Sequence, residues 1–169
     1  MSLVTTPRNI PNLFEEYHVV TIDSIGQSTA NSFTCHLQTP LHNVVQARLL
    51  AASIHTKAIV QHVYVKIDEL NTNFNDRAFT TLEGQASLAK VRGAFASLIS
   101  EVADHTGAGD QLVSYKDNYI VANQYINPIR SLDRFTVSLL DESGNPIPDP
   151  DAAGFNFLVI RFTCAKTNL

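Results

Sequence analysis

Tryptophan is absent from the 169 residues, and the five tyrosines are dispersed along the chain. Carbohydrate-binding modules commonly use a flat aromatic platform, and tryptophan offers the largest such face. The missing tryptophan therefore argues against sugar binding, although a carbohydrate-binding β-sandwich module stays among the alternatives.

Cysteine is scarce as well. Cys35 and Cys164 lie too far apart in the sequence to form a C-x-x-C metal-ligand or redox pair. Each sits in a β-like run, so we interpret them as two small buried side chains. A disulfide bond between them stays open, because the first and last strands could be neighbours.

The chain also lacks an excess of positive charge. Its 12 Lys and Arg residues are outnumbered by 16 Asp and Glu, which gives a net charge of -4. The basic residues are scattered and form no stripe that could neutralise a row of phosphates. We therefore expect no direct contact with nucleic acid.

Long apolar runs are missing too. The longest ones, such as residues 157–160, fall far short of the ~20 residues that a membrane-spanning helix requires. The first residues contain Arg8 and two prolines but no apolar block typical of a secretory signal. We expect no membrane span, and synthesis in a reducing compartment.

Patterns that mark catalytic or metal sites do not occur. Six histidines are present, but no H-x-H pair with a nearby Glu, which a metal-binding cupin enzyme would need. There is no G-x-S-x-G element and no cysteine with an evident base partner. We predict a protein that is not an enzyme, with no catalytic, cofactor-binding or metal-binding residues; a cupin-like enzyme is the competing hypothesis.

What the chain does contain is a series of short stretches of alternating apolar and polar residues. In residues 62–67, Val63, Val65 and Ile67 point one way and the residues between them point the other, the period-2 pattern of a half-buried strand. No regular alternation of strands and helices occurs. The expected class is all-β, a single jelly-roll β-sandwich of about eight antiparallel strands. The expected strands are residues 17–23, 32–37, 44–56, 62–67, 95–99, 119–122, 135–140 and 155–164.

Turn-forming residues separate these strands. The Thr-Pro step at Pro40 and the Asn-Pro step at Pro128 indicate strand ends, because proline restricts the residue before it. Residues 141–146 have the composition of a tight turn in which Gly144 supplies a positive φ. A short helix is possible within residues 78–91.

The chain divides into an arm and one domain. Residues 1–16 contain two prolines and an isolated apolar pair at Leu13 and Phe14, so we interpret them as an extended N-terminal arm. Residues 17–169 are the expected jelly-roll domain, and a chain of this length buries about two-thirds of its unfolded surface.

The last expected strand, residues 155–164, is apolar on both faces. One face can enter the core, whereas a second apolar face is usually covered by something else, such as another protein chain. Apolar residues that the alternation directs away from the core are therefore candidates for contacts between subunits, although the chain's own loops could equally cover them. These candidates are Leu13, Phe14, Tyr64, Phe157 and Val159.

Several segments resemble a known family in their order along the chain. Near the C-terminus, INPIRSLDRFTV (residues 126–137) leads into DESGNPI (residues 141–147) and then into an aromatic-rich final strand. Upstream, HVVTIDS (residues 18–24) and HVYVKIDEL (residues 62–70) followed by FASLI (residues 95–99) are similar as well. Together they resemble the single jelly-roll penton or vertex capsid proteins of large double-stranded DNA viruses and virophages.

The resemblance implies a structural role. Members of that family have no active site, and five copies form a plug at each icosahedral five-fold vertex, surrounded by major capsid protein. The expected partners are therefore further copies of this chain in a homopentamer and the major capsid protein. The expected location is the virion, after synthesis in the host cell interior. A minor capsid or cement protein elsewhere in the shell would use the same fold and is the alternative.

Overall fold

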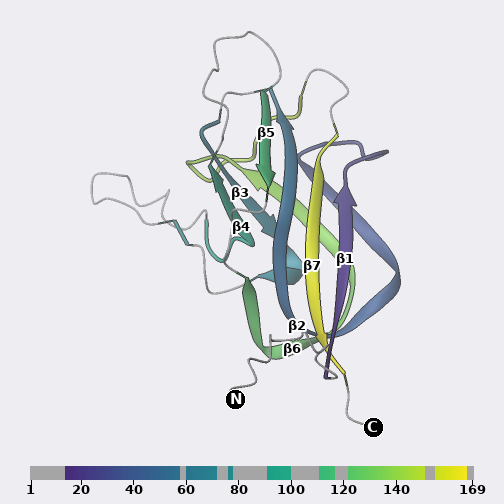
Figure 1. Cartoon of the computed structure of the whole chain (residues 1–169). Coiled ribbons are helices and arrows are strands. Elements are labelled where there is room, and N and C mark those ends of the chain that lie inside the picture. The colour runs from purple at the N-terminus through teal and green to yellow at the C-terminus, as the bar shows by residue number, and fades with distance from the viewer. Residues whose placement is uncertain are drawn as a thin grey trace, which may run out of the picture.

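Seven antiparallel strands and one short 3-10 helix form the regular structure of the computed structural model (Figure 1), which describes residues 14–57, 60–71, 76–77, 91–99, 111–116, 122–150 and 155–166. No α-helix occurs in these residues, so the expected all-β class is confirmed. The strands are β1 (Glu15–Asp23), β2 (Ser32–Thr56), β3 (His62–Ile67), β4 (Ala96–Ile99), β5 (Gln111–Lys116), β6 (Asn123–Leu140) and β7 (Phe157–Ala165), and the helix η1 covers Asp68–Leu70.

Alternating residues form the strands that border the core. In β3, Val63, Val65 and Ile67 are fully buried and the residues between them are partly exposed. In β7, the residues predicted to point inward are buried, whereas Phe157 and Val159 keep partial exposure. Successive side chains of a strand point to opposite faces, so a half-buried strand needs this pattern. The predicted strand at residues 62–67 is confirmed, and so is the inward face of the last strand.

All seven strands belong to one antiparallel sheet with the order β1-β7-β2-β6-β3-β4, and β5 pairs with β2. The long strand β2 serves two sets of neighbours. Its residues 32–42 pair with residues 131–138 of β6. Its residues 44–56 pair with β7 on one side and, on the other side, first with residues 123–129 of β6 and then with β5. Figure 1 shows the sheet curling as β2 and β6 bend.

The bend brings together β6 and β7, which β2 separates in the sheet order, around one core. Phe135 of β6 and Phe162 of β7 are not on neighbouring strands, yet their ring centroids lie 5.7 Å apart. Both rings are fully buried. One continuous cluster of buried residues contains side chains from β1, β2, β3, β4, β6 and β7. Burying this apolar surface is the main force that stabilises the fold.

Two expected strand ends are wrong, because β2 runs through Pro40 and β6 runs through Pro128. The register of the β2–β6 ladder shifts between residues 36 and 41 of β2, and again between residues 124 and 129 of β6. Proline has no N–H to donate, and it is tolerated in a strand where the ladder is interrupted. The prolines therefore mark irregularities inside two long strands.

Two further register shifts in β2, against β7, change which residues face the core. They fall between Val44 and Gln46 and between Leu49 and Ala51. An extra residue in a strand reverses the inward and outward phase of those that follow. If every second residue before the buried Ala52 faced the core, Leu50 would be buried. Instead Leu50 is partly exposed and Leu49 is 2% exposed.

One observed strand was not predicted, and two predicted elements lie almost entirely outside the described residues. The sequence did not indicate β5 (Gln111–Lys116), which pairs with residues 51–56 of β2. The expected helix at residues 78–91 lies outside the described residues except for Val91. Of the expected strand at residues 119–122, only Ala122 is described, and it precedes β6.

The first strand begins within the segment assigned to the arm. Strand β1 begins at Glu15, and Glu15 and Glu16 pair with Ala165 and Cys164 of β7. Two residues assigned to the arm thus belong to the sheet. Residues 1–13 lie outside the described part of the chain.

The turn predicted at residues 141–146 is confirmed. Gly144 has a φ of 77°, and its N–H donates to the carbonyl of Asp141 over 2.9 Å. The Asp141 carboxylate accepts hydrogen bonds from the N–H groups of Ser143 and Asn145. An aspartate that bonds its own following backbone is typical of tight turns.

Candidate interaction surface

On β1 and β7, the most exposed apolar side chains lie on the face that points away from the core. In an antiparallel pair, directly opposite residues share a face. Val19 lies opposite Arg161 and Thr21 lies opposite Val159, so Val19 and Val159 belong to one surface. Because β7 lies between β1 and β2, its outer face forms the middle of this surface. We call it the β1–β7 face; it comprises Tyr17, Val19, Thr21, Asp23, Phe157, Val159, Arg161 and Thr163.

The most exposed apolar residues of this surface lie on β1, whereas the predicted interface residues Phe157 and Val159 lie on β7. Val19 is 62% exposed and Tyr17 is 58% exposed, whereas Phe157 and Val159 are half-buried. The alternation of residues 17–23 already places Tyr17 and Val19 opposite the core-facing side chains. That alternation is the signal that identifies them.

The structure brings only some of the predicted interface residues together. Phe157 and Val159 are close on β7, and Phe14 is 62% exposed just before β1. Tyr64 is on β3 and packs against a small separate cluster formed by Val91, Ala94 and Leu140. Its ring meets the ring of His62 edge to face at 4.2 Å. Tyr64 is thus partly covered by its own chain, and Leu13 lies outside the described residues.

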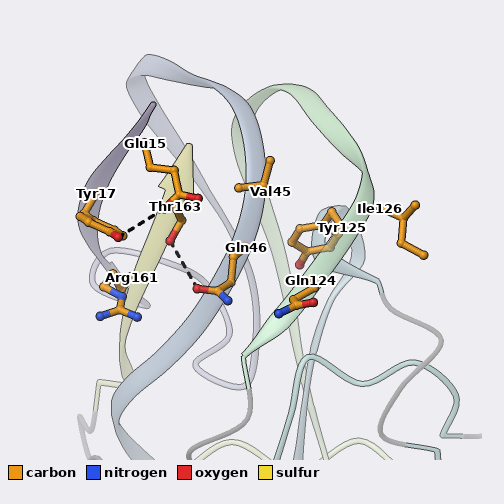
Figure 2. Close-up of a pocket in the computed structure, with 9 residues that line it drawn as sticks. All are labelled: Glu15, Tyr17, Val45, Gln46, Gln124, Tyr125, Ile126, Arg161 and Thr163. Atoms are coloured by element: carbon orange, nitrogen blue, oxygen red, sulfur yellow. Dashed lines mark hydrogen bonds between the residues drawn. The ribbon is translucent and has the colours of Figure 1, made fainter. Parts of the chain in front are cut away.

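A polar hollow of about 340 Å³ lies at the β1–β7 face, on the side of the first residues of β1 (Figure 2). One wall carries Glu15 and Tyr17, whose hydroxyl donates to the Glu15 carboxylate over 3.4 Å. The Arg161 guanidinium lies 5.5 Å from the centroid of the Tyr17 ring, a cation–π contact. The lining residues are Glu15, Tyr17, Val45, Gln46, Gln124, Tyr125, Ile126, Arg161 and Thr163.

The opposite wall of the hollow comes from β6. Figure 2 shows Gln124, Tyr125 and Ile126 there, across from Thr163 and Gln46, which are joined by a 3.4 Å hydrogen bond. Burial raises the pKa of Tyr125, so its hydroxyl stays neutral, and it donates to the carbonyl of Leu70 over 3.3 Å. Amide and hydroxyl groups of this kind can bind polar groups of a partner.

A second, more apolar groove lies beside β1. It has a volume of about 680 Å³ and runs between β1 and residues 37–42 of β2. Val20 and Leu37 in its lining pack against the main core. The lining residues are Glu16, Tyr17, His18, Val19, Val20, Leu37, Thr39, Pro40, Leu41 and His42.

A third hollow lies near η1, and two of the charged residues that line it, Glu69 and Arg134, are hydrogen-bonded to each other. Glu69 accepts hydrogen bonds from the Thr136 N–H at 2.7 Å, the Thr136 hydroxyl at 2.9 Å and the Arg134 Nε at 3.0 Å. Partial burial alone would raise the pKa of Glu69, but these hydrogen bonds outweigh it and lower the pKa below its usual value. The carboxylate therefore ties η1 to β6.

Histidine and cysteine side chains make hydrogen bonds within the fold. Within the described residues, no three His, Cys, Asp or Glu side chains gather closely enough to hold a metal ion. His62 is hydrogen-bonded through Nε2 to the Ser97 hydroxyl at 2.8 Å, and burial lowers its pKa. Both cysteines are free thiols, and the Cys35 Sγ donates to the carbonyl of Asp23 over 3.0 Å.

No protein-family model matches the chain, and no curated protein matches it at a significant level. Among the residues that the structure describes, no helix has both the length and the apolar character to cross a membrane.

Proposed function

We propose that this chain is a single jelly-roll capsid protein that forms a homopentameric plug at the five-fold vertices of an icosahedral virion. The order in which its strands pair carries the proposal. The second part of β2 lies between β7, which β1 follows, and both β5 and the first residues of β6, whereas the first part of β2 begins a group with the order β2-β6-β3-β4. Two groups of strands that share β2 and β6 thus surround one core, and this arrangement supports a jelly roll.

The outer surface supports assembly. Tyr17 and Val19 are more than half exposed on a continuous strand pair, and such apolar groups are usually covered by a partner. A five-fold ring needs a heterologous contact, in which one patch meets a different patch on the next subunit. The β1–β7 face offers one such patch. Ile99 is 74% exposed on β4 at the other end of the sheet order, and we place the second patch around it.

The same features support major capsid protein as the surrounding partner, because each ring at a vertex must also contact the shell. A minor capsid or cement protein elsewhere in the shell would need one apolar patch but no ring. Counting the subunits in the assembly separates these two roles.

A carbohydrate-binding module is the second candidate, and the polar hollow of Figure 2 favours it. Gln46 and Gln124 present amide groups between the rings of Tyr17 and Tyr125, and amides next to aromatic rings suit sugar hydroxyls. Binding on a glycan array that is lost in the Gln46→Ala variant would support this candidate over a purely structural role.

The test of the proposal combines mass and location. Size-exclusion chromatography with light scattering should give a mass of about 93 kDa, five times the 18.6 kDa chain. Reconstruction of purified virus particles should show five copies at each vertex. A protein that is strictly monomeric and absent from particles would contradict the proposal.

A further inference from the structure

Strand β1 lies at the end of the sheet, and among the residues that the structure describes none pairs with the second side of its backbone. The Lys166 N–H donates to the Phe14 carbonyl over 2.8 Å, and the Ser24 N–H donates to the Asn156 carbonyl over 3.1 Å. Because the register between β1 and β7 is unbroken, the even-numbered residues of β1 are the ones that bond to β7. The N–H and C=O groups of the odd-numbered residues therefore point away from the sheet; these residues are Glu15, Tyr17, Val19, Thr21 and Asp23.

This edge has few of the features that usually block pairing with another strand. It is nine residues long and contains no proline and no bulge. Its charged odd-numbered residues, Glu15 and Asp23, stand only at the two ends, and Val19 in the middle is 62% exposed. Natural proteins blunt exposed edges with prolines, bulges or central charges, so an open edge of this kind favours the addition of a strand. The apolar groove beside it provides room for side chains of that strand.

We propose that residues 1–13 of a second copy of this chain pair with the free edge of β1 as an added strand. This inference rests on the proposed function, because it requires that copies of the chain assemble. It identifies the segment that joins one subunit to the next.

The length and the prolines of residues 1–13 fit this edge. Thirteen extended residues span about 43 Å, whereas the nine residues of β1 span about 30 Å. Pro7 and Pro11 are four positions apart, so both missing N–H groups fall on the same side of an extended strand. The other side keeps an uninterrupted row of donors that pairs with β1, from Val4, Thr6, Arg8, Ile10 and Asn12.

The charge and the apolar residues of the segment fit as well. Residues 1–13 contain Arg8 and no acidic residue, whereas β1 contains Glu15, Glu16 and Asp23. In an antiparallel pairing in which the donors from even positions face β1, the odd-numbered side chains lie on the side of the groove. These include the apolar Leu3 and Leu13, which can cover Val20, Leu37 and Leu41.

The conformation at the start of β1 favours pairing of residues 1–13 with β1 of a second copy over pairing with β1 of the same chain. The bond from Lys166 keeps Phe14 in line with the strand. Folding back onto the same edge through a two-residue turn would place that turn at Leu13 and Phe14, where such hairpins require positive φ and favour glycine or asparagine, and a longer turn would leave fewer residues to pair with β1. Phe14 has no positive φ, and both side chains disfavour such a turn.

The experiment compares the full chain with a chain that begins at Phe14, which retains every residue of the described core. Light scattering should show the full chain as an oligomer and the shortened chain as a monomer, with unchanged circular dichroism. A labelled peptide of residues 1–13 should bind the shortened chain, and Val19→Lys in that chain should weaken the binding at least about tenfold.

Proline substitutions in the full chain supply a matched pair. Ile10→Pro removes a donor from the side that pairs and should abolish the oligomer, whereas Ile10→Ala should weaken it less. Asn9→Pro removes a donor from the side that already holds both prolines and should leave the oligomer intact.

The outcomes separate this inference from the proposed function. A monomeric full chain would contradict homo-oligomer assembly itself. Full and shortened chains of equal oligomer number would overturn only the inference. Peptide binding without any change in oligomer number on truncation would assign residues 1–13 to the chain's own edge and would overturn it too.

Discussion

The side-chain amide of Asn156 donates a hydrogen bond over 2.6 Å to the side-chain oxygen of Asn31, although the two residues are 125 positions apart. Both side chains are buried, at 0% and 3% exposure. Asn156 also donates to the Ala30 carbonyl at 2.7 Å and accepts from the His55 N–H at 2.7 Å. The pair therefore joins the start of β2, the end of β2 and the start of β7.

Replacing Asn156 with alanine should lower the free energy of unfolding by about 2–4 kcal/mol, because several buried groups lose their partners at once. The Asn31 oxygen and the His55 N–H would both be left without a protein partner. Urea denaturation measures the change. Asn127→Ala, at an exposed position of β6, is the control and should cost less than about 0.5 kcal/mol. Equal losses in the two variants would contradict the assigned role of Asn156.

Glu69→Gln should destabilise the protein by about 1–3 kcal/mol, because a neutral amide has one acceptor oxygen where the carboxylate has two. The matched control is the neighbouring Asp68→Asn. Asp68 is paired with Lys66 at 3.2 Å in an exposed position, where removing the charge should cost about 0.5 kcal/mol or less. Comparable losses in the two variants, measured by urea denaturation, would count against the network around Glu69.

The Glu69 variant also predicts a change in pH dependence. The pKa of Glu69 is lower in the folded chain than its usual value of 4.5, so its contribution to stability is present above that pH. As the pH falls below 4.5, the unfolded chain binds the proton first and the contribution is lost. The difference in unfolding free energy between the parent protein and Glu69→Gln should therefore shrink between pH 5 and pH 3.

Protonation of His62 should lower the free energy of unfolding at mildly acidic pH. Burial lowers its pKa below 6.5, although Glu142 acts in the opposite direction, so the unfolded chain binds the proton at a higher pH than the folded chain does. The stability associated with neutral His62 is full above pH 6.5 and declines as the pH falls below it. Urea midpoints at pH 7.5 and pH 5.5 should differ more in the parent than in His62→Gln. An identical shift in both proteins would exclude His62 as the cause.

The two thiols should be free but slow to react. Burial raises the pKa values of Cys35 and Cys164, which lowers the fraction of reactive thiolate at neutral pH. Cys164 is only 2% exposed. A thiol reagent should detect two thiols in the unfolded protein without a reductant, and should react at least about tenfold more slowly in the folded protein. Finding no thiols after unfolding would indicate the disulfide that the sequence left open.

Apart from β5, the sequence predicted the strands that contain no bulge of their own. Alternation alone located β3 and the inward face of β7, because one buried face imposes period 2. It could not locate the bulges near Val45 and Leu50, since these depend on pairing with a strand more than 100 residues away. The predictions of strand ends at Pro40 and Pro128 failed for the same reason. Whether a proline ends a strand or lies in a bulge depends on the neighbouring strand, which the local sequence does not reveal.

The interaction surface was predictable in kind but not in detail. Sequence reasoning identified an apolar outer face on the last strand, and Phe157 and Val159 do lie on it. The neighbouring β1 contributes the more exposed residues, and no pattern within residues 155–164 reveals which strand will lie beside it. Alternation likewise predicted that Tyr64 points away from the core. Its side chain is nevertheless packed against the cluster that contains Val91 and Ala94, which lie in a later segment of the chain.

Val19→Ser should weaken assembly without weakening the fold. Val19 is 62% exposed in the free subunit, so a serine there should change the free energy of unfolding by less than about 0.5 kcal/mol. In an oligomer that covers this face, losing the buried apolar group should cost about 1–2 kcal/mol per contact, roughly a tenfold weaker association. Light scattering over a dilution series measures the effect. Ile25→Ser, at a 54% exposed position in the connection from β1 to β2, removes a larger apolar group away from the β1–β7 face. If that variant dissociates as readily as Val19→Ser, general surface hydrophobicity and not this face holds the subunits together.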